Sequence, residues 1–91
     1  MIWLIKPSDT FRTDYRNLRK DIQVLIPDIL RSLAEDPFAP FLRTHPLRDH
    51  LSGYYACSID DEYRIIMRIS EKNHEIKLFD VGNHDIYKRY V

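Results

Sequence analysis

The hydrophobic pattern changes its period near the middle of the chain, and this change limits the possible folds more than any other feature. Between residues 11 and 33, apolar side chains recur three or four positions apart, as in amphipathic α-helices. Between residues 53 and 81 they alternate, as in strands that bury one face. Helices followed by consecutive strands predict an α+β domain with the helices packed on one face of a sheet.

Local signals predict the order β-α-α-β-β-β with a short C-terminal helical tail. An apolar strand at residues 1–6 ends at Pro7, and Ser8 or Asp9 can cap the helix that follows. Pro27 should kink the second helix or mark its start. We expect two helices joined near residues 20–21, a loop over 36–47, and an antiparallel sheet with strands at 53–59, 62–70 and 75–81.

The composition indicates one folded domain, residues 1–91. A chain of 91 residues supports a single modest core, and 44% hydrophobic with 31% charged residues argues against disorder. The longest early apolar run, residues 2–5, is too short for a signal peptide or a membrane span. We therefore expect a cytoplasmic protein with no membrane segment, and a single cysteine, Cys57, fits a reducing compartment.

The net charge is zero, and basic and acidic residues are close to balance in each part of the chain. Proteins that hold nucleic acid by releasing counterions usually carry a basic excess. If RNA or DNA is the target, folding must gather a few arginines on one face, or a partner must help to position the substrate.

The stretch that best indicates a function is the last one, where an apolar strand runs into Gly82. Glycine adopts backbone angles closed to other residues, so we expect Gly82 to end the strand and turn the chain over the sheet edge. His84 and Tyr87 follow three positions apart and share a face if the tail is helical. They form either a functional imidazole–phenol pair or a cover for the core, whereas Ile86 and Tyr90 are expected to pack.

Two arginines are expected on the sheet face away from the helices. Arg64 and Arg68 point to the same side of the second hairpin strand, and Ser58 comes from the strand beside it. Such arginines would form a small cationic floor suited to phosphate oxygens. The alternative is a solvent-facing strand with ordinary charges.

Two histidines, His45 and His50, flank Arg48 in the irregular segment before the first hairpin strand. No Cys/His spacing typical of zinc sites accompanies them, so we expect no metal ion. Cys57 lies in the middle of a predicted strand and should be buried and inert rather than nucleophilic. The chain also lacks a glycine-rich phosphate loop and the signatures of serine hydrolases and zinc proteases, and we expect no cofactor.

His45, His84 and Tyr87, with Arg64 and Arg68, are the residue types that RNA cleavage by 2′-hydroxyl attack requires. A base removes the 2′ proton, an acid protonates the leaving 5′ oxygen, and a guanidinium stabilises the charge on the pentavalent phosphate. Histidine titrates in the pH range suited to either proton role. The residues leave open which histidine is the base and which is the acid.

Five motifs are spread along the chain from residue 11 to residue 87: Phe-Arg-Thr-Asp-Tyr (11–15), His-Pro-Leu-Arg (45–48), Gly-Tyr-Tyr-Ala (53–56), Asp-Glu-Tyr-Arg-Ile-Ile (61–66) and Asp-Val-Gly-Asn-His-Asp-Ile-Tyr (80–87). In their order and spacing the chain resembles the RelE/YafQ-type toxins of the RelE/ParE superfamily, from bacterial type II toxin–antitoxin modules. This resemblance implies a microbial RNase fold, ribosome-dependent cleavage of mRNA in the decoding site, and inhibition by a small cognate antitoxin.

The resemblance implies catalytic roles for four residues. His45 matches the histidine that opens the His-Pro-Leu motif, and Arg64 matches the arginine that stabilises the transition state. His84 falls where members of the family place a catalytic histidine or arginine, and Tyr87 falls on the tyrosine of the tail.

A second group is expected to contact the RNA: Arg48, Ser58, Tyr63 and Arg68. The departures from the family lie on the hairpin. Where some members carry lysines and others a histidine, residues 55–58 are Tyr-Ala-Cys-Ser, and residues 62–63 are Glu-Tyr where YafQ-like proteins have Asp-Trp. These missing basic residues bear on the strength of catalysis rather than on the fold.

Three functions are compatible with this resemblance. The first is a ribosome-dependent mRNA endonuclease. The second is a ParE-type toxin that poisons DNA gyrase by binding it, which does not need the His/Arg/Tyr set. The third is a member that acts mainly in a complex with its antitoxin, which binds operator DNA and represses its own operon. The expected partners are therefore a cognate antitoxin, the ribosome and mRNA, with operator DNA bound only through the antitoxin complex.

Overall fold

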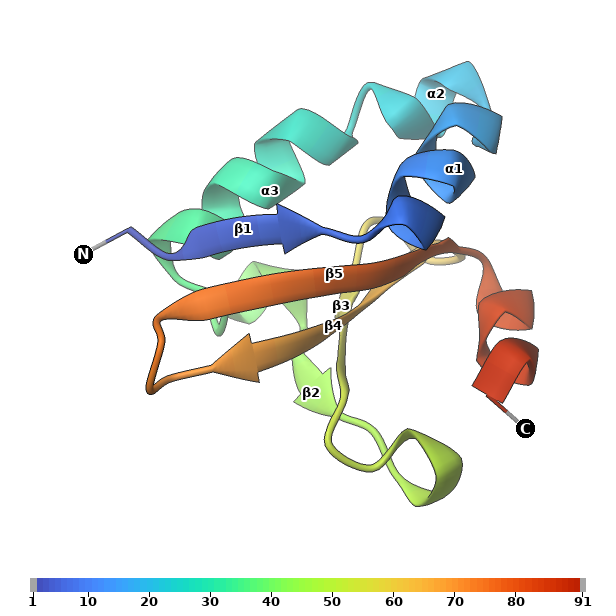
Figure 1. Cartoon of the computed structure of the whole chain (residues 1–91). Coiled ribbons are helices and arrows are strands. Elements are labelled where there is room, and N and C mark those ends of the chain that lie inside the picture. Colours follow the sequence, from blue (N-terminus) through green and yellow to red (C-terminus); the bar gives the residue numbers. More distant parts are fainter. Residues whose placement is uncertain (1, 91) are drawn as a thin grey trace.

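The computed structural model describes residues 2–90, which form two layers, a five-stranded sheet and helices along one of its faces (Figure 1). The strands are β1 (Leu4–Pro7), β2 (His45–Pro46), β3 (Tyr55–Ser58), β4 (Arg64–Ser70) and β5 (Glu75–Gly82). The helices are α1 (Asp9–Asn17), α2 (Lys20–Gln23) and α3 (Ile26–Glu35), with short 3-10 helices η1 (Pro40–Leu42), η2 (Asp49–Leu51) and η3 (His84–Tyr90). The predicted α+β class is confirmed.

The sheet is mixed rather than fully antiparallel. Its strands lie in the order β1-β5-β4-β3-β2, and β3, β4 and β5 are antiparallel neighbours as predicted. β1 pairs in parallel with β5, with Leu4 opposite Glu75, so the prediction of an antiparallel sheet is wrong for the first strand. The helices that follow β1 cross one face of the sheet, and such a crossover allows the first and last strands to run in the same direction.

The helical layer has three segments where two helices were predicted. Ser8 caps α1, because its side-chain oxygen accepts a hydrogen bond from the backbone N–H of Phe11. The second predicted helix is divided into α2 and α3 by residues 24–25. Pro27 lies in the first turn of α3, where a proline costs no helical hydrogen bond, so the prediction that it marks a helix start is confirmed.

The predicted loop over residues 36–47 contains a short edge strand. In β2, His45 lies opposite Ala56 and Pro46 opposite Tyr55. An edge strand tolerates proline because its outer side needs no N–H donor. This pairing places His45 on the sheet rather than in a free loop.

The core lies between the helices and the inner face of the sheet. It includes Phe11 from α1, Leu33 from α3, and Cys57, Met67 and Leu78 from three successive strands, the last four with no exposed surface. The alternation predicted for the strands is therefore confirmed on this face. Among the described residues, no helix has the length and apolar character needed to cross a membrane.

Candidate functional site

The C-terminal tail is fixed to the end of β5 by close packing beneath Gly82. Gly82 is buried, and a Cβ placed on it would lie 2.5 Å from Cγ2 of Ile86. Its backbone does not adopt a positive φ, which among the described glycines occurs at Gly53. The prediction that Gly82 is required for its backbone angles is therefore wrong, because what matters is its missing side chain. Ile86 packs as predicted, with 4% of its surface exposed, and the side chain of Tyr90 lies outside the described residues.

Arg64 lies beside the start of this tail. It is the first residue of β4 and pairs with Gly82 across the sheet. Its Nη1 donates hydrogen bonds to the backbone carbonyl oxygens of Asp60 at 2.7 Å and Tyr63 at 3.0 Å, so the hairpin turn holds the guanidinium in place. The side chain is only partly exposed. One positive charge is thus fixed where β4 and β5 meet the tail.

Tyr87 and His84 come from η3, next to this arginine. Tyr87 is half-buried, and burial raises the pKa of its phenol, while the positive charge of Arg64 acts in the opposite direction. The phenol therefore stays protonated through neutral pH. The ring centroids of His84 and Tyr87 are 6.1 Å apart, and the His84 side chain is exposed. Three of the four predicted catalytic residues are thus brought together.

His45 lies farther away, on the edge strand β2. Two strand spacings, about 10 Å, separate the backbones of β2 and β4. Nδ1 of His45 lies 2.8 Å from the carbonyl oxygen of Arg43. Because a carbonyl oxygen only accepts hydrogen bonds, Nδ1 carries the proton, and in the neutral imidazole Nε2 is the proton acceptor. The imidazole is exposed and can receive a proton on its outer nitrogen.

The predicted RNA-contacting residues do not form one continuous surface. Ser58 pairs with Arg64 and is close to the site. Arg68 is exposed at the other end of β4, about 13 Å along the strand, with its guanidinium 5.3 Å from the ring centroid of Tyr54. Between the two arginines lies Ile66, which has no exposed surface. The cationic floor predicted for this face is therefore split into two separate positions.

Tyr63 lies on the other face of the sheet, and Arg48 lies beyond the edge strand β2. Arg48 is exposed at the start of η2. Tyr63 is on the helical side of the sheet, with the guanidinium of Arg19 5.6 Å from its ring centroid. There it lines a polar cleft of about 400 Å³ between α1 and the tail, together with Asn83. Pro46 lies opposite Tyr55, so Arg48 follows at the end of β3 away from Ser58.

Arg89 is a residue that the sequence did not single out. Its Nη1 lies 2.6 Å from a carboxylate oxygen of Asp14 in α1 and 2.9 Å from one of Asp80 in β5. These partners are 75 and 9 positions away, so no local spacing signals the contact. The one available signal was Asp80 itself, an acid inside an apolar strand.

Cys57 is buried in β3, and burial raises the pKa of its thiol to about 12. The prediction that it is buried is confirmed. Within residues 2–90, no three His, Cys, Asp or Glu side chains are arranged to share a metal ion.

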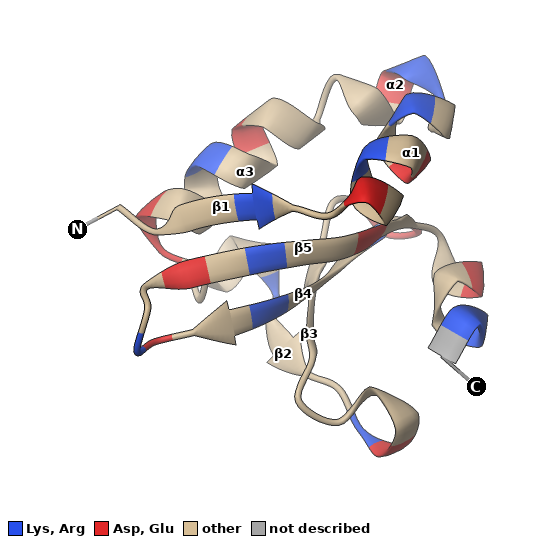
Figure 2. Ribbon diagram, in the orientation of Figure 1, with Lys and Arg blue, Asp and Glu red and all other residues tan. Residues whose placement is uncertain are grey.

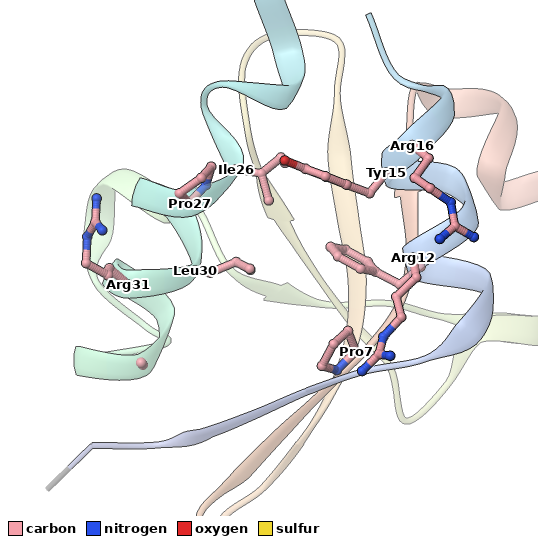
Figure 3. Close-up of a pocket in the computed structure, with 10 residues that line it drawn as sticks. Pro7, Arg12, Tyr15, Arg16, Ile26, Pro27, Leu30 and Arg31 are labelled. Carbon is pink, nitrogen blue, oxygen red and sulfur yellow. The ribbon is translucent and has the colours of Figure 1, made fainter. Parts of the chain in front are cut away.

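An apolar groove of about 560 Å³ runs between α1 and α3, on the helical layer (Figure 3). Figure 3 shows Tyr15 of α1 pointing across it toward Ile26, with Leu30 entering the same space. Arg12 and Arg16 lie on the α1 side with exposed side chains. Arg31, paired with Asp28, lies on the α3 side, and apart from these three arginines the walls that face each other are largely hydrophobic.

Comparison with known proteins identifies the family. No family model matches the sequence. Toxin YoeB of Synechocystis sp. is 32% identical over 63 residues, which cover 69% of this chain and 69% of that toxin. The chain belongs to the RelE/ParE superfamily of toxins. Toxin YoeB of Streptomyces coelicolor is 40% identical over 53 residues, 58% of each protein. The resemblance drawn from the sequence motifs is confirmed.

Solved structures of toxins share this fold. The toxin–antitoxin complex RelBE2 from Mycobacterium tuberculosis contains a chain that matches with a TM-score of 0.79 and 20% identity, over 92% of this chain and 100% of that one. YafQ from E. coli matches with a TM-score of 0.77 and 17% identity, over 93% of this chain and 97% of YafQ. A chain of the archaeal RelE–RelB complex from Pyrococcus horikoshii matches with a TM-score of 0.76 and 18% identity, over 91% of this chain and 96% of that one. At these identities the likeness concerns the fold alone.

Proposed function

We propose that this chain is the toxin of a toxin–antitoxin pair and that it cleaves mRNA on the ribosome. Membership of the RelE/ParE superfamily supports the first part. One observation carries the second: Arg64 lies beside the tail that holds His84 and Tyr87. A fixed guanidinium, an exposed imidazole and a protonated phenol at one sheet edge suit transesterification of RNA without a metal ion.

Each residue has a role in this reaction. The ribose 2′ oxygen attacks the adjacent phosphorus, the bond from phosphorus to the 5′ oxygen breaks, and the products are a 2′,3′-cyclic phosphate and a 5′-hydroxyl. Nε2 of His45 accepts the 2′ proton, and His84 donates a proton to the leaving oxygen. Arg64 stabilises the charge on the phosphate oxygens. Tyr87, protonated at neutral pH, donates a hydrogen bond or stacks on a base.

The balanced charge is compatible with this role because the ribosome would hold the mRNA. Figure 2 shows basic and acidic residues intermixed over the helices and strands, and the formal net charge is zero. Such a surface gives little electrostatic affinity for free RNA. We therefore expect slow cleavage of RNA in the absence of ribosomes.

The groove between α1 and α3 supports a protein partner. Its apolar walls suit the apolar face of an amphipathic helix, and Arg12 and Arg16 favour acidic residues at the edge of that face. We assign this helix to the cognate antitoxin. The groove and the Arg64 site are on different parts of the molecule, so an antitoxin would have to extend around the toxin to cover both.

Induced expression followed by sequencing of RNA 5′ ends tests the nuclease. The wild type should cut mRNA in translated frames, and His84→Ala and Tyr87→Phe should lower the cleavage rate, by about 10²- to 10⁴-fold for the proton donor. His50→Ala is the matched control, because His50 is an exposed histidine in η2 that has no role in the proposed reaction. Growth arrest without cuts would contradict the proposal and favour a gyrase poison. Arrest equally strong in both tail variants would exclude the assigned roles.

A further inference from the structure

Arg89 connects three parts of the fold that are distant in sequence. It comes from η3, and its guanidinium bridges Asp14 of α1 and Asp80 of β5. Asp80 is 3% exposed, whereas about half of the Arg89 side chain is exposed. A buried carboxylate left without its cation would be costly. The contact therefore favours one placement of η3 against the sheet.

The tail needs such a contact because η3 is not a stable helix by itself. It has seven residues of 3-10 type, too short and too weakly hydrogen-bonded to hold its shape alone. At its start, Asn83 accepts hydrogen bonds from the backbone N–H groups of Asp85 and Ile86. Ile86 packs under Gly82, and Arg89 forms the ion pairs three residues later. Tyr87 lies between these two anchors.

We propose that Arg89 is a positioning residue, which holds the tail so that Tyr87 and His84 remain beside Arg64. The expected effect of Arg89 on cleavage rests on the proposed function. Its expected effect on the position of the tail does not. Arg89 itself touches carboxylates only, and it acts through η3. The bridge also links α1, which lines the apolar groove, to the tail of the candidate site.

The test compares Arg89→Met, which keeps the length of the side chain and removes its charge, with Arg89→Lys. Lys88→Met is the matched control, because Lys88 is an 82% exposed neighbour paired only with Asp85 among the described residues. Three measurements are made on each purified full-length variant. They are ribosome-dependent cleavage, with kcat and KM separated, the pKa of Tyr87 from ¹³C-labelled tyrosine, and amide hydrogen exchange of residues 84–89.

Arg89→Met should lower kcat at least tenfold with little change in KM. The pKa of Tyr87 should fall toward about 10 as its ring leaves the buried position, and the tail amides should exchange faster while those of β4 and β5 stay protected. Arg89→Lys should restore part of each effect, and Lys88→Met should behave as wild type. Asp14→Asn, which removes one partner from the α1 side, should give a smaller change of the same kind.

An Arg89→Met variant with wild-type kcat, an unchanged Tyr87 pKa and a protected tail would overturn the inference. So would equal effects from Lys88→Met. If the wild type cuts no mRNA, the proposed function fails by itself. The pKa and the exchange of the tail then decide the positioning role: a loosened tail in Arg89→Met supports it, and an unchanged tail overturns it.

Discussion

At the scale of single residues, Cys57 has a measurable effect on stability at high pH. Burial raises the pKa of its thiol from 9.0 to about 12. Between these values the unfolded chain loses the thiol proton and the folded chain keeps it, so rising pH favours unfolding. The free energy of unfolding should fall by about 1.4 kcal/mol per pH unit from this group.

Urea unfolding at pH 8 and pH 10 measures this contribution. The wild type should lose about 1.4 kcal/mol more between the two pH values than Cys57→Ala does, because tyrosines and lysines titrate in both proteins. The cavity left by the substitution lowers stability equally at either pH. Identical losses in the two proteins would contradict a buried, protonated thiol.

Gly82 is required because a side chain at this position would collide with Ile86. Experiment can separate this steric requirement from a requirement for the backbone conformation of glycine. In Gly82→Ala the new methyl group would lie 2.5 Å from Cγ2 of Ile86, so the side chain of Ile86 must shift and its packing under β5 is disturbed. We expect a loss of about 1–3 kcal/mol in the free energy of unfolding, as for other overpacked sites, and faster amide exchange in the tail.

A double-mutant cycle with Ile86→Ala provides the control. That change removes the clashing methyl group, so the double variant should be more stable than the sum of the two single losses predicts. Strict additivity would instead indicate that the alanine is disfavoured for its backbone conformation.

At the scale of elements, the sequence predicted what depends on local patterns. Alternation gave β3, β4 and β5 and their inner faces, and the apolar stripe with Ser8 gave α1 and its start. The sequence patterns did not predict β2, because a strand of two residues is too short to show an alternation of hydrophobic and polar residues. They also missed the parallel pairing of β1 with β5, which joins segments about 70 positions apart. Such pairings depend on how the helices cross the sheet, which no local spacing encodes.

The residues of the candidate site also differ in whether local sequence patterns could predict their positions. Arg64 and Tyr87 could be predicted together because a strand start and a tail after Gly82 are adjacent in any hairpin of this kind. Arg68 was placed on the correct face, but the length of the strand separates it from Arg64. Tyr63 was assigned to the substrate although strand alternation directs it to the helical side, where it meets Arg19. Contacts that join distant segments, such as Arg89 with Asp14, were not predictable.

At the scale of the whole molecule, α1 contributes both to the apolar groove and to the support of the candidate site. Tyr15 and Arg16 face the groove, whereas Asp14 holds the tail through Arg89. A helix bound in the groove would bring acidic residues close to Arg12 and Arg16. These arginines lie outside the candidate active site. Their replacement should therefore lower the affinity of the toxin for its antitoxin and leave the cleavage activity of the free toxin unchanged.

Charge reversal provides the measurement. Arg16→Glu should lower the affinity of the antitoxin about tenfold or more at low salt, mainly through slower association, and the difference from wild type should shrink as salt is added. Lys72→Glu, an equal change of charge at the exposed turn between β4 and β5, should have little effect. Equal losses in the two variants would show that net charge alone governs binding, and the antitoxin helix would then have to bind away from the groove.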